Sequence, residues 1–501
     1  MRTIPDPVRQ RAALAPDKPA FIEGATGRVW RFADIDRRAG RGAAILRAAG
    51  LAPGDRVVVL CHNTPVFFDL LFAAMRAEII LVPLNWRQTE AELAPILADC
   101  GARLMLADQA NGALAAALAS GAGLAWMPLE AFDRRCEESG DALAAAPWPT
   151  ERPWYLLYTS GTTGRPKAVI QNAGMMLANA VNVQLATGVN EATEALNFLP
   201  LFHTAGINLH TLPVFLAGGT SHVIPKFEVD TVLDLIDSGR LTVFFGVPQV
   251  YQQMSLAARF ERTDFSRVRH WGCGGAPIPV ALIRAFLARG VTICNGMGMT
   301  ETGPTVFFMD PAHAAAKPGS VGKPQLLAEV RLVDGEGRDV GAGEPGEVLF
   351  RGPGITPGYF NNPDATAAAF TPDGWLRSGD VAIRDADGYY AIVDRIKDMY
   401  ISGGENVYPA EIEHALLDHP AILEAAVIGV PDPRWGEVGH AAILLRPGAS
   451  VDVAALKIEL RQRLAAYKVP QHITILPEFP RTAAGKIQKH LLRRALTEAS
   501  S

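Results

Sequence analysis

The ten residues Tyr158–Lys167 constrain the fold more than any other part of this 501-residue sequence. They hold two glycines, four Ser/Thr hydroxyls and two cationic side chains, and they follow the apolar run Trp154–Leu157 directly. Glycine lets a backbone approach a ligand closely and adopt positive φ, while N–H groups, hydroxyls and cations all donate to phosphate oxygens. The stretch therefore predicts a buried strand followed by a loop that wraps a polyphosphate.

Two familiar loop motifs do not fit this stretch. A Walker A loop has Gly-Lys-Ser/Thr leading into a helix, whereas Gly164 is followed by Arg165-Pro166-Lys167, and proline has no N–H to offer a phosphate. A nucleophile elbow needs Gly-x-Ser-x-Gly, and the first of these glycines is missing before Ser160. The alternative is a Gly/Thr-rich surface turn, but the order of residues after an apolar strand favours a phosphate loop.

The composition sets the class of protein. Hydrophobic residues make up 49% and charged residues 20%, as in multidomain globular proteins. A net charge of -5 gives no basic footprint for nucleic acid. The five cysteines form no CxxC pair, which fits a reducing compartment. Because the N-terminus lacks the apolar segment of a signal peptide and no long apolar run follows, we expect a cytoplasmic protein with no membrane span.

Strand-like and helix-like segments alternate in the first 150 residues. Arg56–Leu60, Ile79–Pro83 and Leu104–Ala107 are predicted strands. Helices are predicted at Thr64–Ala77 and from a capping box at Thr89 to Cys100, with Gly101 ending the second helix. This alternation predicts a mainly parallel sheet covered by helices. Short strands are predicted to follow the loop at Val243–Gly246, Val268–Cys273 and Val291–Asn295.

The amino-acid composition and the predicted secondary structure change twice in the rest of the sequence. Residues 319–390 are rich in glycine and proline, and the alternating runs Glu329–Val333 and Glu347–Phe350 predict a β-rich subdomain. The tail predicts a compact α+β unit, with helices at 409–417 and 453–464 and strands at 425–429 and 441–445. The charged stretch Asp394–Asp398 separates the two. We therefore predict an α/β fold with an N-terminal domain at residues 1–396 and a small, mobile C-terminal domain at residues 397–501.

Five further segments have side chains suited to chemistry. They are Asn197–Gly206 with His203, Cys273–Pro277, Gly296–Glu301, Trp375–Asp380 together with Asp394-Arg395, and Pro480–Lys489 with Lys486. Segments that follow strands lie where open α/β sheets bind ligands, and a glutamate there suits Mg²⁺. Each segment taken alone also has a purely structural interpretation: a structural histidine, a tight turn, a surface ion pair or a solvated lysine.

Together these segments resemble the core motifs of the adenylate-forming superfamily, which includes acyl-CoA synthetases, aryl-CoA ligases, luciferases and peptide-synthetase adenylation domains. The resemblance runs from about Arg31 to Lys489. The motifs occur in the expected order as Tyr158–Lys167, Leu199–Gly206, Gly274–Pro277, Gly298–Glu301, Ser378–Asp380, Asp394–Lys397, Ser402–Pro409 and Pro480–Lys486. Phe245–Pro248 through Tyr251, Cys273–Pro277 and Val430–Gly436 are typical of bacterial fatty-acyl-CoA and feruloyl-CoA synthetases.

The resemblance implies an acid–thiol ligase that uses ATP, Mg²⁺ and CoA. In this family the carboxylate attacks the α-phosphorus of ATP to give acyl-AMP and pyrophosphate, and the thiol of CoA then displaces AMP. The implied substrate is a medium-chain fatty acid or an aromatic, for example hydroxycinnamic, acid. The alternatives are an enzyme that loads a carrier protein in trans and an inactive binding protein of this fold. A homodimer stays open as an oligomeric state.

Family roles transfer to matching positions of this sequence. Lys486, Thr300 and His203 are implied to be catalytic, Glu301 and Thr163 to hold Mg²⁺, and Lys397 to be the hinge about which the small domain rotates. The implied ATP- and AMP-binding residues are Thr159, Ser160, Gly161, Thr162, Thr163, Gly164, Lys167, Gly274, Gly275, Ala276, Pro277, Met297, Gly298, Met299, Thr300, Asp380, Arg395 and Lys486. The implied CoA-binding residues are Ser402, Gly403 and Gly404, and the implied acyl pocket comprises His203, Ala205, Gly206, Asn208, Gly274, Met299 and Pro304.

Some positions depart from the family pattern. Met297 stands where the family usually has an aromatic residue, often tyrosine, that stacks on adenine. Ala168 replaces the more common glycine, and Gln171-Asn172 replaces the usual Thr-His pair. We therefore expect weaker ATP binding and an altered exit from the phosphate loop. The sequence continues for only about 15 residues past Lys486, which favours free CoA over a fused carrier as the acceptor.

Overall fold

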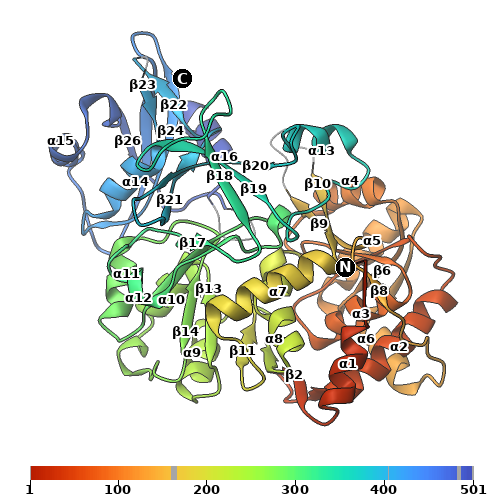
Figure 1. The fold of residues 1–501 in the computed structure, drawn as a ribbon. Coiled ribbons are helices and arrows are strands. Elements are labelled where there is room, and N and C mark those ends of the chain that lie inside the picture. Colours follow the sequence, from red (N-terminus) through yellow and green to blue (C-terminus); the bar gives the residue numbers. More distant parts are fainter. Residues whose placement is uncertain (1, 160–165, 404, 482–486, 499–501) are drawn as a thin grey trace.

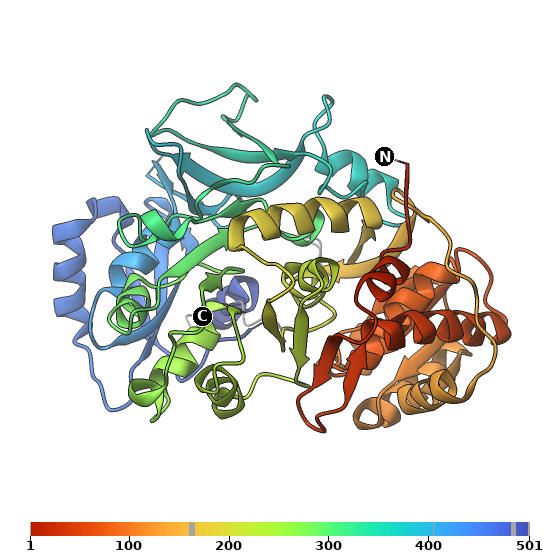
Figure 2. The same ribbon diagram turned by 60° about the horizontal axis from the view of Figure 1, so that its bottom comes forward.

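The computed structural model describes residues 2–159, 166–403, 405–481 and 487–498. Its N-terminal elements form helix-covered sheets and a β-rich subdomain, and its C-terminal elements gather at the end away from the N-terminus in both views (Figures 1 and 2). The predicted α/β class, with a large N-terminal and a smaller C-terminal domain, is confirmed. The boundary at 396/397 falls in the turn between β21 (Tyr390–Arg395) and β22 (Tyr400–Ser402), and it stays a prediction.

The first sheet is mainly parallel, as predicted. Its six strands, in spatial order, are β10 (Lys167–Asn172), β9 (Pro153–Thr159), β5 (Ile80–Pro83), β4 (Arg56–Leu60), β6 (Ala102–Ala107) and β7 (Ala125–Pro128). Only β10 runs antiparallel to its neighbour. The associated helices are α1 (Pro7–Leu14), α2 (Phe32–Ala48), α3 (Pro65–Arg76), α4 (Glu90–Cys100), α5 (Gly112–Ala122) and α6 (Leu129–Glu138).

Helix α4 has both of the predicted ends. The Thr89 backbone N–H donates to the Glu92 carboxylate at 2.8 Å, as a capping box requires. Gly101 ends the helix with φ 58°, in the left-handed region that glycine adopts without strain. Local sequence therefore determines where this helix starts and stops.

Two further sheets build the rest of the helix-covered domain. The second contains β11 (Glu194–Asn197), β12 (Thr220–Val223), β2 (Pro19–Glu23) and β3 (Val29–Arg31). The third contains β13 (Val243–Gly246), β14 (His270–Cys273), β15 (Ile293–Met297), β16 (Phe307–Phe308) and β17 (Lys323–Pro324). Their helices are α7 (Ala173–Thr187), α8 (Thr211–Ala217), α9 (Val229–Asp237), α10 (Pro248–Leu256), α11 (Val280–Leu287) and α12 (Pro311–Ala314). Helix α7 crosses the middle of the molecule in both views (Figures 1 and 2).

Two predicted strands begin two residues later than expected. Strand β14 starts at His270 instead of Val268, because the Val268 N–H closes a turn with the Phe265 carbonyl at 3.3 Å. Strand β15 starts at Ile293 instead of Val291, because the Val291 N–H caps helix α11 through the Phe286 carbonyl at 3.0 Å. In both cases the preceding turn uses the backbone groups that a strand would need.

Beside a short pair of β1 (Thr3–Ile4) and β8 (Trp148–Pro149), two more sheets confirm the predicted β-rich subdomain and α+β tail. The subdomain sheet contains β18 (Glu329–Val333), β19 (Pro345–Arg351), β20 (Leu376–Arg384) and β21, with α13 (Pro363–Ala369) beside it. The tail sheet contains β23 (Glu405–Val407), β22, β25 (Gly436–Leu445), β24 (Ile422–Asp432) and β26 (His472–Ile475). Its helices are α14 (Pro409–Leu417), α15 (Val453–Arg463) and α16 (Lys489–Glu498).

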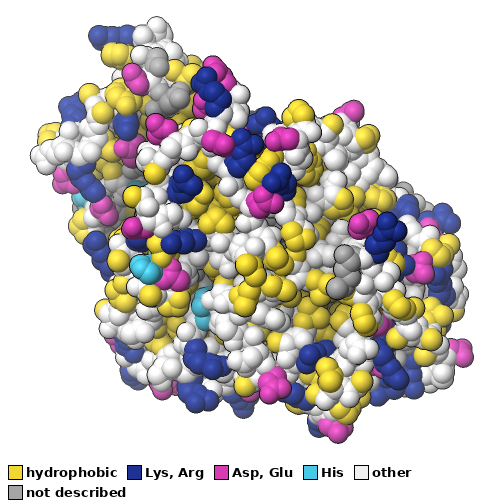
Figure 3. Space-filling view, in the orientation of Figure 1, with side chains coloured by type: hydrophobic (Ala, Val, Ile, Leu, Met, Phe, Trp, Pro, Cys, Tyr) yellow, Lys and Arg dark blue, Asp and Glu magenta, His cyan; other side chains and the backbone are white. Residues whose placement is uncertain are grey.

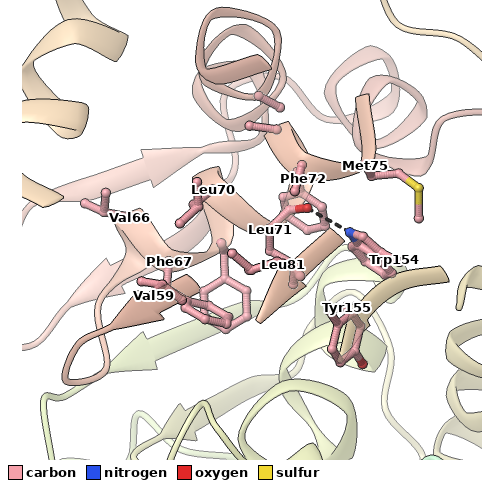
Figure 4. Packing of buried hydrophobic residues seen from close by; sticks show 14 of the residues in the cluster. Val59, Val66, Phe67, Leu70, Leu71, Phe72, Met75, Leu81, Trp154 and Tyr155 are labelled. Atoms are coloured by element: carbon pink, nitrogen blue, oxygen red, sulfur yellow. Dashed lines mark hydrogen bonds between the residues drawn. The ribbon is translucent and has the colours of Figure 1, made fainter. Parts of the chain in front are cut away.

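The largest hydrophobic cluster packs α2 and α3 against the first sheet. Figure 4 shows its centre, where Trp154 of β9 lies beside Phe72 and its indole N–H donates to the Leu71 carbonyl at 2.8 Å. All five cysteines are free and buried, as expected for small core residues. This packing fixes β9, the strand that leads into the predicted phosphate loop.

The surface agrees with the composition. On the face in Figure 3, Lys and Arg side chains are interspersed with Asp and Glu and form no patch of one sign. Within the described ranges, no helix combines the length and apolar character that crossing a bilayer requires.

A buried ion pair joins α2 to α3. The Arg38 side chain is 1% exposed, and its Nε donates at 2.7 Å to Asp69, which is 0% exposed. Arg38 also pairs with Asp133 and Glu137 of α6. Burial raises the pKa of Asp69 to about 6, against the lowering effect of Arg38. The carboxylate therefore depends on this guanidinium to stay charged at neutral pH.

Arg38→Met should lower the free energy of unfolding by about 3–5 kcal/mol, because it leaves a buried carboxylate without its counter-charge. The double variant Arg38→Met/Asp69→Leu should recover most of this loss. Denaturant unfolding followed by circular dichroism measures both. In the surface pair Arg338–Asp334, Arg338→Met serves as the control and should cost less than about 1 kcal/mol. A double variant no more stable than the single one would contradict this account.

Candidate active site

Residues 356–360 lie along the outer edge of β10, next to the predicted phosphate loop. The Phe360 N–H donates to the Ala168 carbonyl at 2.8 Å, and the Ile170 N–H donates to the Gly358 carbonyl at 3.1 Å. This pairing sets Tyr359 beside the start of the strand, where Lys167 Nζ lies 5.1 Å from the centre of its ring. A segment far along the chain thus completes the surroundings of Lys167.

The phosphate-loop prediction is tested only at its ends. Lys167 and Thr159 are opposite partners in the antiparallel pair of β10 and β9, and both are half-buried. A strand, not a helix, therefore follows the loop. Ser160, Gly161, Thr162, Thr163 and Gly164 lie outside the described residues, as do Gly404 and Lys486, so their roles stay predictions.

Glu301 is buried where these segments meet. Its side chain accepts a hydrogen bond from the Tyr359 hydroxyl at 2.9 Å, and its backbone carbonyl accepts the Thr356 N–H at 2.8 Å. Burial raises the pKa of the Glu301 carboxyl, while the charges of Lys167 and Arg395 act in the opposite direction. Glu301 is therefore a desolvated carboxylate close to two cations and one hydroxyl.

The donor set around Glu301 suits Mg²⁺. Magnesium prefers oxygen ligands and usually binds through one or two carboxylates together with substrate phosphates. Among the described residues, no group of three or more His, Cys, Asp or Glu side chains could form an all-protein metal cage. A single buried carboxylate beside the predicted phosphate loop therefore fits an ion shared with a nucleotide.

The two glycine-containing motifs lie at the same edge of the third sheet. Because β14 and β15 are parallel neighbours, Gly274–Pro277 and Gly298–Glu301 both follow their carboxyl ends. A Cβ at Gly298 would come within 1.5 Å of the Pro304 carbonyl oxygen, so only glycine fits there. Met297, Met299 and Pro304 are half-buried beside this turn. The structure thus brings together the residues predicted for the adenine and for the start of the acyl group.

Asp380 and Arg395 are opposite partners in β20 and β21. The Arg395 Nε forms an ion pair with Asp380 Oδ1 at 3.1 Å, and Asp380 is buried while Arg395 is about half exposed. The charge of Arg395 acts on Glu301, which places this pair near the carboxylate. The two residues predicted to hold a ribose are therefore adjacent.

The His203 segment leads into a short π-helix, Ala205–Leu209. A π-helical turn frequently marks a functional site. Gly206 is required here, because a Cβ would lie 2.4 Å from the Pro200 carbonyl oxygen. His203 is half-buried and packs against Phe202. Its neighbour Ala205 lines a small pocket beneath the π-helix.

Gln171 connects the phosphate strand to the other motifs. Its amide donates to the Thr300 carbonyl at 2.8 Å and accepts from Asn208 at 3.3 Å. The Asn208 amide also donates to the Thr204 hydroxyl at 3.1 Å, so it is engaged within the fold. Sequence reasoning identified Gln171 only as a departure from the family and missed Tyr359 and Thr356 as site residues. No local signal marks the last two.

The predicted CoA and hinge residues lie in the C-terminal part. Ser402 is buried at the end of β22, and Gly403 turns the chain with φ 61° and donates its N–H to the Trp435 carbonyl at 2.8 Å. Lys397 is exposed in the turn between β21 and β22. Its place between the two sheets suits a hinge, which stays a prediction.

Known proteins match this chain along nearly its full length. The family model of the AMP-binding enzyme matches residues 8–360, and that of the AMP-binding enzyme C-terminal domain matches residues 411–486. A feruloyl-CoA synthase of Amycolatopsis sp. is 42% identical, with 97% of this chain and 98% of the relative covered. An indoleacetate–CoA ligase of Aromatoleum aromaticum is 37% identical, with 97% of both chains covered.

A solved structure agrees with these relatives. The o-succinylbenzoate CoA synthetase of Bacillus subtilis, determined in complex with its acyl-adenylate intermediate, superposes with a TM-score of 0.89 at 30% identity and covers 99% of this chain and 98% of its own. Three observations lead to one conclusion: the order of the motifs, their convergence around Glu301, and the matches to known proteins. The chain belongs to the AMP-binding enzymes of the adenylate-forming superfamily and is an acyl-CoA synthetase.

Proposed function

We propose that this acyl-CoA synthetase activates an aromatic or medium-chain carboxylic acid with ATP and transfers the acyl group to CoA. The observation that carries the proposal is the convergence of Lys167, Tyr359 and Arg395 on the buried carboxylate of Glu301. Such a cluster next to a Gly/Thr-rich loop suits triphosphate binding. The names of the aromatic-acid relatives support the substrate class.

In the first step, a carboxylate oxygen of the acid bonds to the α-phosphorus of ATP, and the bond from that phosphorus to the bridging oxygen of pyrophosphate breaks. Lys486 neutralises charge between the two reactants, and Lys167 and the phosphate loop hold the departing pyrophosphate. Mg²⁺, held by Glu301, would offset the negative charge on phosphate oxygens. Asp380 and Arg395 orient the ribose, which fixes the α-phosphorus relative to the acid.

In the second step, the sulfur of CoA attacks the acyl carbon, the bond to the AMP oxygen breaks, and the thiol proton passes to solvent. The C-terminal domain rotates about Lys397 between the steps, replacing Lys486 by the Ser402–Gly403 turn. Rotation lets one site serve two reactions. Transfer to a carrier protein is the alternative, and incubation with CoA as the sole acceptor separates the two: thioester formation supports CoA.

Lys486→Ala should reduce acyl-AMP formation by at least about 100-fold, because it removes a cation that acts where charge builds up. It should spare the conversion of supplied acyl-AMP to acyl-CoA. Pyrophosphate release and thioester formation measure the two half-reactions separately. The exposed Lys226 provides the matched control, Lys226→Ala, which should leave both unchanged. An equal loss in both half-reactions would refute the assignment of Lys486.

Gly403→Leu should do the reverse: at least about a 10-fold loss of the CoA step, with acyl-AMP formation retained, because the side chain fills the path of the CoA arm. Leucine is also strained at φ 61°. Gly448→Leu is therefore the control, because Gly448 has φ 75° in an exposed turn beyond the end of β25 and carries the same kind of strain. An intact CoA step in Gly403→Leu, or the same loss in both variants, would count against a CoA path at this turn.

Met297→Tyr should lower the KM for ATP by about 2- to 12-fold, the equivalent of about 0.5–1.5 kcal/mol of ring stacking. Initial rates of pyrophosphate release at saturating acid provide the measurement. An unchanged or raised KM would indicate that the sulfur of Met297 already packs on the adenine as well as a ring does.

A further inference from the structure

A hydrogen bond crosses the predicted boundary between the two domains. The Asp394 side chain lies on β21, in the N-terminal part, and is 7% exposed. One of its carboxylate oxygens accepts the backbone N–H of Ala410 at 2.9 Å, in the first turn of α14. Helix α14 belongs to the C-terminal part and lies beside β21 (Figure 1). A rotation of the C-terminal part about Lys397 therefore has to break this bond.

A second contact lies on the same face of α14. Glu413 follows Ala410 by three positions, so the two residues share one face of the helix. The Nζ of Lys489, the first residue of α16, lies 2.7 Å from a Glu413 oxygen. That oxygen also accepts the Val427 N–H of β24 at 2.8 Å. Lys489 and Glu413 are thereby held together within the C-terminal part.

The charge of Lys489 acts on both parts of the molecule. Lys489 lies at a helix N-terminus, where the helix dipole disfavours a cation. Burial acts to lower the pKa of Lys489, but the carboxylates of Glu413, Asp394 and Asp398 outweigh it and raise that pKa. Asp398 directly follows the predicted hinge residue Lys397. Lys489 is therefore a charged ammonium close to the hinge and to carboxylates of both parts.

Asp394 needs these partners to stay charged. Burial raises the pKa of the Asp394 carboxyl to about 6, and the charge of Glu413 acts in the same direction. The charge of Lys489 and the N–H groups of Ala410 and Arg395 act against burial. A buried carboxylate is costly without such donors and counter-charges. Rotation would separate Asp394 from Ala410 and Lys489, whereas Glu413 would keep its lysine.

These contacts join two segments that carry predicted site residues. Asp394 directly precedes Arg395, which forms an ion pair with Asp380 at 3.1 Å. Lys489 follows Lys486 by three positions in the sequence. The orientation in this structure therefore brings the segment that follows the predicted adenylation lysine close to the strand of the predicted ribose pair. Acyl-AMP formation requires this orientation in the proposed mechanism.

We propose that Asp394 and Lys489 form a latch that holds the C-terminal domain in the orientation for acyl-AMP formation and that breaks before the CoA step. Lys489 is a positioning residue, because it acts through the orientation of the domain. The inference rests on the proposed function and adds the contact that sets the balance between its two orientations. Loss of the latch shifts that balance toward the orientation for the CoA step.

Two substitutions weaken the latch from opposite sides of the domain boundary: Asp394→Asn and Lys489→Met. Each should slow acyl-AMP formation by about 5- to 50-fold, because the productive orientation becomes less populated. Conversion of supplied acyl-AMP to acyl-CoA should be kept or accelerated. The KM for ATP should stay within about 2-fold of the native value, because the ribose pair is unchanged. The probe acid is 4-hydroxycinnamate or octanoate, whichever the native enzyme activates.

Two further variants separate the latch from a general loss of stability. Lys468 pairs with Glu411 at 2.7 Å, also on α14 but entirely within the C-terminal part. Lys468→Met is therefore the matched control and should leave both half-reactions unchanged. Lys489→Arg keeps the positive charge and should retain acyl-AMP formation within about 3-fold of the native rate.

A distance measurement detects the orientation without any reaction. All five native cysteines are buried, so spin labels attach to cysteines introduced at two exposed positions, by Glu336→Cys near β18 and Glu459→Cys on α15. Double electron–electron resonance should show one main distance in the native enzyme. Asp394→Asn and Lys489→Met should each reduce the population at that distance by at least about 2-fold.

The outcomes separate the latch from the proposed function. The latch is overturned if the variants form acyl-AMP at the native rate, slow both half-reactions equally, or keep the native distance distribution. The same effect in Lys468→Met also overturns it, as does a raised KM for ATP in Asp394→Asn, because a displaced Arg395 would then explain the loss. Failure of the native enzyme to form acyl-AMP or a CoA thioester from either acid overturns the proposed function instead, and the distances still decide the latch.

Discussion

The candidate site depends on the pairing of β10 with residues 356–360. This pairing attaches the β-rich subdomain to the first sheet and carries Tyr359 to Lys167 and Glu301. Without it, the Glu301 carboxylate would lose its hydroxyl donor and stay buried, a costly arrangement for a charged group. Three segments that are distant in sequence are thereby held at one point, where we propose that a nucleotide and its metal ion bind.

The N-terminal and C-terminal parts have different tasks in the proposed mechanism. We propose that the N-terminal elements bind phosphate and ribose, on strands that the core around Trp154 holds in place. The exposed turn at Lys397 connects these elements to a separate small sheet. In the proposed mechanism, the N-terminal part binds the AMP portion of the reactants, which both half-reactions share. The C-terminal domain replaces Lys486 by the Ser402–Gly403 turn between the two half-reactions.

Short sequence patterns predicted the helix ends, which interactions between neighbouring residues determine. The capping box at Thr89 and the glycine at 101 set both ends of α4, and α14 has the predicted bounds 409–417. Late starts at β14 and β15 arise because turn hydrogen bonds take the first backbone groups. The motifs also predicted that residues after β14 and β15 and on β20 and β21 belong to one site, since the family order links them.

Contacts between residues that are far apart in the sequence had no sequence pattern that predicted them. The Thr356 hydroxyl donates a hydrogen bond to the Ile170 carbonyl, 186 positions away in the sequence. No sequence periodicity indicates that Tyr359 lies beside the same strand. A lone histidine gives no such signal either, so the sequence did not single out His210 and His270, which are both buried. Asn208 was among the predicted pocket residues; its amide donates to Gln171 and Thr204, and its place in the pocket stays a prediction. Burial and unsatisfied polar atoms become visible only once the chain is folded.

The central claim is that one site makes an acyl-adenylate and then a CoA thioester. A single-turnover experiment with enzyme in excess over ATP, an acid such as 4-hydroxycinnamate, and Mg²⁺ tests it most directly. Without CoA, we predict one equivalent of pyrophosphate and an enzyme-bound acyl-AMP, which disappears into acyl-CoA and AMP when CoA is added. Release of ADP and phosphate, or thioester formation with no acyl-AMP before it, would contradict the account.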